Sequence, residues 1–538
     1  MPAPDVSAVA RDLLEPHARL RPGQRDAMEA VLEHDTLAVL ATGTGKTLIY
    51  QVAAELIDGP TLVVSPTIAL QADQLAALRA SGATAETLNS TRRPAQRRRA
   101  LEAFGARRLE FLLLAPEQLT RPDVVAVLAE AGIGLFVVDE AHCVSMWGED
   151  FRPDYLALAA VIGTLGRPRV LALTATASPA TRERICDALG LTDPVVVVGG
   201  ADRAEIWLGA RQVATEDDVT HELAELLRPL ADEQQTAIVY AATRRRTEEL
   251  VERLRAEGLE PVAYHGGLAT RERTQVHRGF RDGSTRLVVA TSAFGLGVDR
   301  ADVRLVVHAD PPERLDDYWQ EVGRAGRDGE AARGILFTHP TAYGVRRYFA
   351  AGTGTDAADL SALLMVLRSA EGPVRPGDLA RAADLSTARS RRAVNVLLRS
   401  GAILESRAGI LLRDDTPPGE LVDQAVALAD GLKAERETGV ELIRRYAETA
   451  DCRRRLVLEL LGEAHPQPCG ACDNCDAGRS SPAIDRPYPL GADVRHDEWG
   501  LGTVSQYEGD RVVVLFESGG YRTLSLDAVR ERDLLEPA

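Results

Sequence analysis

The segment 37–54, LAVLATGTGKTLIYQVAA, constrains the fold more than any other part of the sequence. Its apolar start at 37–40 predicts a buried strand, the glycines that follow predict a turn, and the pattern from Lys46 onward predicts a helix. In such a unit, backbone N–H groups surround a phosphate, Lys46 reaches its oxygens and the Thr47 hydroxyl can hold Mg²⁺. Ala41 replaces the first glycine of the strict motif, so the loop alone leaves open a glycine-rich turn without a nucleotide.

Short β-type runs then alternate with helical patterns, which predicts parallel sheets covered by helices on both faces. A helix is expected at 12–33. In the first series we expect strands at 37–40, 61–65, 110–115, 135–138 and 170–174. After Gly190 the pattern restarts, with strands expected at 236–240, 261–264, 286–290, 304–307 and 334–337. The fold class is therefore α/β, with two such domains in the first part of the chain.

Two further groups of charged residues suit phosphate chemistry. Asp139 and Glu140 follow the apolar run at 135–138, where Asp139 could bind Mg²⁺ and Glu140 could orient or deprotonate a water molecule. The alternative is a pair of acids that caps the next helix. Arg324 and Arg327, separated by small residues in GRAGR, could reach a transferred phosphate from across a cleft, although alone they would more often be surface cations.

Four of the six cysteines lie close together in the sequence, at positions 452, 469, 472 and 475. No basic segment followed by an apolar one opens the chain, so we expect a cytoplasmic protein, in which cysteine clusters bind metal rather than form disulfides. Four thiolates meet the tetrahedral demand of a structural Zn²⁺ ion, with no position open for catalysis. Buried or free thiols are the alternative.

The overall charge argues mildly against nucleic-acid binding, because the net charge is −17. Basic clusters nevertheless occur, and each is more commonly a solvated helix face than a binding patch. They lie at 92–93 with 97–99, at 244–246, at 391–392 and at 453–455. No stretch approaches the length of a membrane span.

Beyond the two α/β domains the pattern changes twice. Residues 357–414 predict three helices and a β-hairpin, a winged-helix pattern with Arg389, Arg391 and Arg392 on its third helix. This unit could bind duplex DNA, contact a protein or be purely structural. A Ser/Pro-rich linker at 479–489 leads to short strands that predict a small β-barrel of the SH3 or Tudor kind.

The motifs, in their order, resemble those of superfamily 2 helicases and in detail those of the RecQ family of ATP-dependent DNA helicases. The resemblance covers about 12–340 and 428–476, and its motifs are specific as a set. It rests on the stretches LRPGQRDAM, ATGTGKTLIYQ, VVSPTIAL, LLLAPEQL, VVDEAHCVSMWGEDFRPDY, LALTATA, YHGGL, VVATSAFGLGVDRADVRLVVHADPP and YWQEVGRAGRDG, and on the cysteine cluster. It implies two RecA-like motor domains that share one ATP site, with ATP, Mg²⁺ and Zn²⁺ as cofactors.

The resemblance also implies residue roles. Gln24 would recognise adenine, and Arg324 and Arg327 would sense the γ-phosphate from the second domain. The segment 143–155 matches the aromatic-rich loop that couples DNA binding to hydrolysis, where Met146 and Glu149 replace polar residues of the family. Stacking on bases would come from Trp147 and Phe151, with Arg152 adding a cation. The nucleotide site would comprise His17, where the family usually has an aromatic residue, together with Arg21, Gln24, Thr42, Gly43, Thr44, Gly45, Lys46, Thr47, Asp139, Glu140 and His142.

The predicted organisation is a first motor domain at 1–200, a second at 201–345, the winged-helix-like insert at 356–414, the zinc-binding domain at 425–478 and the barrel at 490–538. The barrel resembles the C-terminal Tudor-like module of UvrD-type helicases, which predicts a protein partner. We expect a bacterial, nucleoid-associated helicase that moves 3′→5′ on single-stranded DNA, acts on tailed or forked DNA in recombination and repair, and has no membrane partner. An RNA helicase, a translocase that does not unwind, and a DNA-binding scaffold with a decayed motor are the alternatives.

Overall fold

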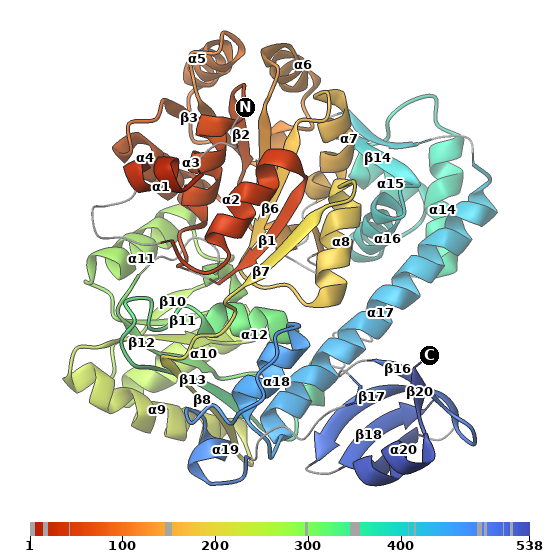
Figure 1. Cartoon of the computed structure of the whole chain (residues 1–538). Coiled ribbons are helices and arrows are strands. Elements are labelled where there is room, and N and C mark those ends of the chain that lie inside the picture. Colours follow the sequence, from red (N-terminus) through yellow and green to blue (C-terminus); the bar gives the residue numbers. More distant parts are fainter. Residues whose placement is uncertain are drawn as a thin grey trace.

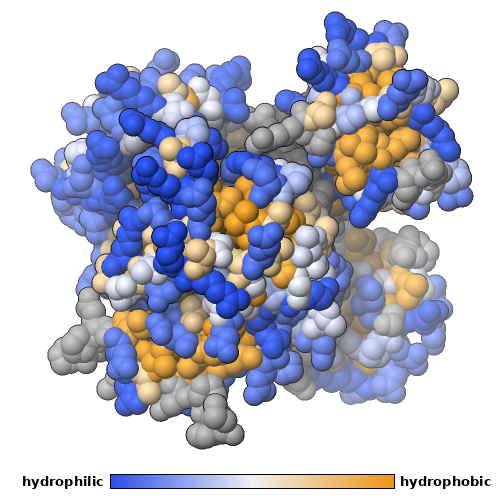
Figure 2. Space-filling model, turned by 90° about the horizontal axis from the view of Figure 1, so that it is seen from above, coloured by the Kyte–Doolittle hydropathy of each residue, from blue (hydrophilic) through white to orange (hydrophobic). Residues whose placement is uncertain are grey.

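The fold was analysed in a computed structural model (Figure 1). The structure describes residues 6–537, except 14–19, 42, 146–152, 296–299, 345–355, 407, 414–415, 481–486, 489–491, 509–510 and 517–519. Among these residues no helix combines the length and apolar character needed to span a membrane. Most of the surface seen in Figure 2 is hydrophilic, with separate apolar patches.

The first domain is built on a seven-stranded sheet in which all neighbouring strands run parallel. Successive residues of its strands face opposite sides: Leu37 and Val39 enter one core, and Ala38 and Leu40 enter the other. The strands, in order across the sheet, are β3 (Ala85–Leu88), β4 (Phe111–Leu114), β2 (Thr61–Val64), β5 (Leu135–Val138), β6 (Arg169–Thr174), β1 (Thr36–Leu40) and β7 (Val195–Gly199).

Helices cover both faces of this sheet (Figure 1). They are α1 (Val6–Leu13), α2 (Gln24–Glu33), α3 (Lys46–Leu56), α4 (Ile68–Ala80), α5 (Pro94–Gly105), α6 (Pro122–Ala131), α7 (Leu158–Thr164) and α8 (Pro179–Leu189). Short 3₁₀ turns lie at η1 (Pro116–Gln118), η2 (Ala141–Ser145) and η4 (Pro153–Ala157). The prediction of a single helix at 12–33 is wrong. Pro22 and Gly23 form a non-helical turn before α2, and the φ angle of Gly23 is 77°.

The second domain repeats the plan with a six-stranded, entirely parallel sheet. Its strands, in order across the sheet, are β10 (Val262–Tyr264), β11 (Leu287–Ala290), β9 (Thr236–Tyr240), β12 (Val303–His308), β13 (Ala332–Thr338) and β8 (Ile206–Gln212). Its helical elements are α9 (Glu216–Asp232), α10 (Arg244–Ala256), α11 (Thr270–Asp282), η5 (Ser292–Phe294) and α12 (Leu315–Val322). The ten predicted strands of the two domains are present to within two residues at either end, whereas β3, β7 and β8 were not predicted.

The insert contains the three helices and the hairpin that the sequence predicts. They are α14 (Ala357–Arg368), α15 (Pro376–Ala382), α16 (Thr387–Arg399), β14 (Ile403–Ser406) and β15 (Gly409–Leu412). They share one core with the start of the long helix α17 (Pro418–Glu448), through Leu421 and Ala425. This helix runs diagonally across Figure 1 and joins the insert to the second domain.

The far end of α17 enters a core that belongs jointly to the second sheet and to the cysteine-rich region. Ile443 and Tyr446 of α17 lie in the same cluster as Tyr318 and Trp319 of α12. Helices α18 (Arg453–Leu460) and α19 (Asp473–Asp476) complete the region. The edge strand β8 pairs directly with it, because the N–H of Leu208 donates to the carbonyl of Ala471 at 3.1 Å.

The C-terminal part is a five-stranded antiparallel sheet with its own small core, consistent with the expected SH3- or Tudor-like module. Its strands, in order across the sheet, are β19 (Gly520–Ser525), β18 (Arg511–Phe516), β17 (Gly500–Glu508), β16 (Asp493–His496) and β20 (Glu536–Pro537). Helix α20 (Leu526–Arg532) links β19 to β20 and packs Leu526 and Val529 into the core.

Candidate active site and metal centre

The loop between β1 and α3 has the geometry that phosphate binding requires. Gly43 and Gly45 have φ angles of 76° and 74°, a conformation that strains any other residue. Lys46 is the first residue of α3, and its Nζ donates a hydrogen bond to the carbonyl of Leu40 at 3.2 Å. The Thr44 hydroxyl closes the loop by donating to the carbonyl of Ala41 at 2.8 Å. Thr42 and the more distant His17 lie outside the described residues.

Gln24 and Arg21 contact the loop from the start of α2. The buried amide of Gln24 donates to the carbonyl of Thr44 at 2.6 Å, while its oxygen accepts the N–H of Arg21 at 2.7 Å. The Arg21 guanidinium donates to the carbonyl of Gly43 at 2.7 Å. The residue predicted to recognise adenine therefore also fixes the shape of the phosphate loop, a contact that its position in the sequence did not reveal.

The predicted acids lie at the carboxyl end of β5, next to the loop. Glu140 has a φ of 49°, an uncommon conformation for a residue with a side chain that is often found at functional sites. Gln74 of α4 donates to the Asp139 carboxylate at 2.6 Å. Burial and the neighbouring Glu140 raise the pKa of Asp139 to about 7. Burial alone would raise the pKa of Glu140 too, but Lys46 and His142, followed by Arg324 and Arg327, lower it instead.

His142 connects the first sheet to the second. Its Nδ1 lies 3.1 Å from the hydroxyl of Thr174 and 3.3 Å from the Glu140 carboxylate. Its Nε2 lies 3.5 Å from the side-chain amide of Gln320, on α12 of the second domain. Burial lowers the pKa of His142, which favours the neutral ring and a hydrogen bond to that amide.

The two predicted arginines meet the phosphate loop from the second domain. A methyl group added to Gly43 would lie 3.7 Å from the Cγ and Cδ of Arg327, so the Arg327 chain packs over the loop. Arg324 is buried. The pKa of Lys46 is lowered mainly by the burial of Lys46 itself, and the positive charges of Arg327 and Arg324 lower it further. The structure thus brings Lys46, Asp139, Glu140, Arg324 and Arg327 together where the two domains meet.

Arg203, which belongs to none of the motifs in the sequence, supports the arginine-bearing turn from the segment that leads into β8. Its guanidinium is buried and donates to the carbonyls of Gly323 and Ala325, both at 2.6 Å. Those residues flank Arg324 on either side. Arg203 also lines a small pocket between the sheets with Thr176 of the first domain and Trp319, Gln320 and Gly323 of the second.

The residues predicted to contact DNA, Trp147, Phe151 and Arg152, lie outside the described residues, as do Met146 and Glu149. Their flanks are described: η2 precedes them and η4 follows them. Helix α16 of the insert contacts η4, so the insert touches the first domain directly after this segment.

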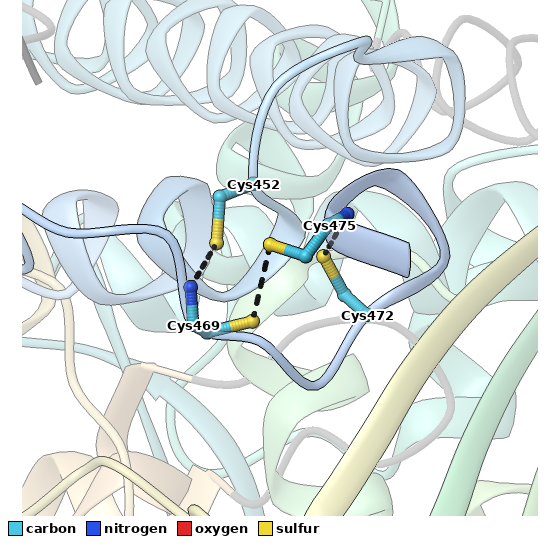
Figure 3. A group of neighbouring side chains, drawn as sticks. All are labelled: Cys452, Cys469, Cys472 and Cys475. Atoms are coloured by element: carbon cyan, nitrogen blue, oxygen red, sulfur yellow. Dashed lines mark hydrogen bonds between the residues drawn. The ribbon is translucent and has the colours of Figure 1, made fainter. Parts of the chain in front are cut away.

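The four clustered cysteines point their sulfur atoms toward one another (Figure 3). All four sulfurs lie within 4.8 Å of one another, and those of Cys469 and Cys475 are 3.8 Å apart. Four sulfurs bound to one zinc ion at about 2.3 Å would stand about 3.8 Å apart. Cys452 caps the start of α18, and Cys472 that of α19.

The charges within this cluster also suit a cation. Hydrogen bonds from Cys469 and Cys472 lower the pKa of Cys452 to about 3, whereas the bond to Cys452 raises the pKa of Cys469 far above its usual range. Once one thiolate has formed, its negative charge opposes ionisation of the next, and a bound cation removes that opposition. The residues present therefore fit a structural zinc ion.

One expectation for the basic clusters needs correction. Arg453, Arg454 and Arg455 do not form a solvated helix face, because all three are at most 4% exposed. They make ion pairs instead, with Asp473 at 2.6 Å, Asp202 at 3.2 Å and Asp451 at 3.0 Å respectively. On the third helix of the insert, Arg389 pairs with Asp359 of α14 at 2.5 Å, while Arg391 and Arg392 are exposed.

Comparison with known families agrees with this geometry. The chain matches the DEAD/DEAH box helicase family over 21–185, the helicase conserved C-terminal domain over 218–329 and the RecQ zinc-binding family over 422–476. It is 33% identical over 473 residues to the ATP-dependent DNA helicase RecQ of Synechocystis sp., a match that covers 85% of this chain and 95% of that protein. The chain belongs to the RecQ family of ATP-dependent DNA helicases. Its zinc-binding match, 422–476, contains the four cysteines described above.

Other relatives of this RecQ-family chain match over a shorter span. The RecQ helicase of Pasteurella multocida is 36% identical over 332 residues, which cover 60% of this chain and 50% of that protein. The chain thus spans about half the length of that relative. It likewise covers 52% of the RecQ helicase of Haemophilus influenzae. Among solved structures, the DUF1998 helicase MrfA bound to DNA has a TM-score of 0.53 and covers 78% of this chain and 64% of its own, at 19% identity, which is evidence about the fold alone.

Proposed function

We propose that this RecQ-family protein is an ATP-dependent DNA helicase that couples ATP hydrolysis to translocation on single-stranded DNA and to duplex unwinding. The observation that carries the proposal is the packing of Arg327, from the second sheet, over Gly43 of the phosphate loop in the first. A site divided between two domains is assembled and opened by their relative motion, which is how hydrolysis becomes movement along a strand.

Within this proposal each wall of the cleft has its own task. The loop residues Thr42, Gly43, Thr44 and Gly45 surround the phosphates with their N–H groups, and Lys46 neutralises them. Arg21, Gln24 and His17 shape the base side of the nucleotide site. Glu140 orients the attacking water and accepts its proton, and its lowered pKa keeps the carboxylate ionised for this task. Arg324 and Arg327 stabilise the charge that develops on the transferred phosphate, and His142 relays the state of the site to Gln320.

Magnesium is part of the proposed site, held by the Thr47 hydroxyl and Asp139. When bound, Mg²⁺ would neutralise part of the negative charge of the phosphates. Burial and the neighbouring Glu140 carboxylate raise the pKa of Asp139 to about 7, so a cation here would favour the ionised acid. The zinc ion would be structural, because four cysteines leave no open position.

On the nucleic-acid side, we propose stacking by Trp147 and Phe151 with a cationic contact from Arg152, 3′→5′ movement, and tailed or forked DNA as substrate in recombination and repair. Arg391 and Arg392 of the insert are exposed cations that could contact duplex phosphates. Work at the bacterial nucleoid, within the cytoplasm, follows from that substrate.

In the C-terminal module the exposed side chains of Leu515 and Tyr521 are neighbours across two strands, which supports contact with a protein partner.

The direct test is an unwinding assay on duplexes with a 3′ tail, a 5′ tail or a fork, with an RNA duplex as control. We expect ATP-dependent unwinding of the 3′-tailed and forked DNA, little unwinding of the 5′-tailed DNA, and none by Lys46→Ala, which should still bind tailed DNA. Unwinding by Lys46→Ala would contradict the site assignment. A preference for the RNA duplex would favour an RNA helicase. ATP hydrolysis without strand separation would favour a translocase that does not unwind, and DNA binding without hydrolysis would favour a DNA-binding scaffold.

A further inference from the structure

Behind Arg324 lies a row of four buried aromatic rings that phosphate binding does not account for. Tyr240 ends β9, His308 ends β12, Tyr318 lies on α12 and Tyr446 lies on α17. The ring centroids are 5.2 Å apart for Tyr240 and His308, 4.9 Å for His308 and Tyr318, and 4.7 Å for Tyr318 and Tyr446. None of the four is more than 3% exposed, so the row crosses the interior of the second domain.

At one end the row meets the arginine. The Tyr240 hydroxyl is buried, and the Arg324 side chain lies within hydrogen-bonding reach of it. Burial raises the pKa of Tyr240, and the positive charge of Arg324 acts in the opposite direction and lowers it. A buried hydroxyl without a partner is costly, and a nearby guanidinium is the donor that would satisfy it.

A second connection fixes the backbone from which Arg324 projects. The Nε2 of His308 lies 2.6 Å from the Glu321 carboxylate, and both side chains are buried. The carbonyl of Glu321 in turn accepts the N–H of Arg324 at 3.2 Å. The His308 ring therefore contacts Tyr240 on one side and holds the start of the arginine-bearing turn on the other.

At its other end the row reaches the cysteine cluster. The hydroxyls of Tyr318 and Tyr446 are hydrogen-bonded at 2.8 Å. The Arg453 guanidinium lies 5.6 Å from the centre of the Tyr446 ring and donates to Asp473 at 2.6 Å. Asp473 stands directly after Cys472, so the series of contacts that begins at the proposed catalytic arginine reaches the turn that holds the proposed zinc ligands.

We propose that Tyr240 is a positioning residue for Arg324, and that the ring row makes the placement of Arg324 depend on the zinc-binding region. The Tyr240 hydroxyl accepts a hydrogen bond from the guanidinium and sets where it rests between cycles of hydrolysis. Close-packed rings cannot shift one at a time, so a displacement at Tyr446 is passed to Tyr240. The inference rests on the proposed function, because the effect of Arg324 is measured as ATP hydrolysis.

The test compares DNA-stimulated ATP hydrolysis by the full chain, by Tyr240→Phe, by Tyr446→Phe and by the double variant. Each substitution keeps the ring and removes only the hydroxyl. Tyr507→Phe is the matched control, because it removes a buried hydroxyl that donates to the carbonyl of Tyr488 at 2.7 Å in the remote C-terminal sheet. Melting temperatures of all variants show whether a loss of activity is a loss of folding.

We expect Tyr240→Phe to lower kcat about fivefold, the worth of one hydrogen bond, with KM for ATP within about twofold and the melting temperature within about 2 °C. Tyr446→Phe should lower kcat about twofold, and the double variant should lose less than the product of the two factors, because both act on one arginine. Tyr507→Phe should leave kcat unchanged.

An unchanged kcat in Tyr240→Phe would overturn the inference, as would effects that simply multiply in the double variant or a fall in activity that follows the melting temperature. These results presuppose a wild-type chain that hydrolyses ATP when DNA is added. A wild-type chain without that activity would refute the proposed function, and the inference with it.

Discussion

The two parallel sheets share an architecture but contribute different chemistry to the cleft between them. The first sheet presents the phosphate loop and the acids at the carboxyl ends of β1 and β5, where open α/β sheets bind ligands. The second sheet has no phosphate loop and contributes Gln320, Arg324 and Arg327, from α12 and the turn that follows it. In the proposed mechanism the first wall therefore binds ATP and supplies the base, and the second wall supplies the arginines that stabilise the transferred phosphate.

The sheets also differ in what supports their edges. In the first sheet, β7 is an edge strand whose one strand partner among the described residues is β1. In the second, β8 pairs with β13 on one side and meets the cysteine-rich turn on the other, through Leu208 and Ala210, whose N–H groups donate to Ala471 and Asp473. A change in the zinc site should consequently affect the second sheet and leave the first largely intact.

The largest expected effect comes from Glu140→Gln, which keeps the shape of the side chain and removes the proposed base from the first wall. We expect kcat for ATP hydrolysis to fall about 10³-fold, since general base catalysis contributes on the order of 10²- to 10⁴-fold. Affinity for a fluorescent ATP analogue should be unchanged or higher, because a negative charge near the phosphates is lost. A kcat within tenfold of wild type would show that another group activates the water.

An intermediate effect is expected from Cys469→Ala, which removes one of four predicted zinc ligands. Zinc content, measured by atomic absorption, should fall from one ion per chain to near zero. The amides of Leu208 and Ala210 should then exchange with deuterium about 10²-fold faster, because their acceptors lie in the cysteine-rich turn. Amides of β1 serve as the internal reference, and Cys186→Ala, at an isolated cysteine of the first domain, is the matched control. Equal acceleration in both sheets would contradict the asymmetry.

The smallest effect is expected from Gln24→Ala, which removes the amide that bonds to the phosphate loop and to Arg21. We expect KM for ATP to rise about tenfold with little change in kcat, as the loss of one or two hydrogen bonds predicts. Arg25→Ala is the control, because Arg25 is exposed on the same helix and its pair with Glu29 lies at the surface. A fall in kcat at constant KM would assign Gln24 to the hydrolytic step instead.

The sequence predicted the parts of the fold whose local pattern matches their surroundings. Buried parallel strands such as 135–138 are apolar throughout, so their position and type were evident. The edge strand β3, Ala-Glu-Thr-Leu, is half polar and lacks that pattern. The four valines of β7 are residues typical of a strand. The prediction of one helix at 12–33 is wrong at Pro22 and Gly23, because both residues favour turns and a helix begins only after them.

For the candidate site, residue types could be predicted but not their partners. The loop, the acids, the two arginines and the four cysteines follow from motifs, and the structure brings each group together. The contacts of Arg203, Gln74 and Gln24 depend on segments far apart in the sequence, which no local pattern specifies. The triplet at 453–455 shows the same limit, because buried arginines differ from solvated ones only in the acids that the fold places beside them.

The division of labour between the two walls is tested most directly by measuring nucleotide affinity and hydrolysis side by side for Lys46→Ala and Arg327→Ala. We predict that Lys46→Ala weakens binding of the ATP analogue at least tenfold and abolishes hydrolysis. Arg327→Ala should bind the analogue within about threefold of wild type while kcat falls about 10³-fold, as expected for an arginine that acts on the transferred phosphate. Equal loss of binding in both variants, or wild-type hydrolysis by Arg327→Ala, would contradict the account of a site divided between the two sheets.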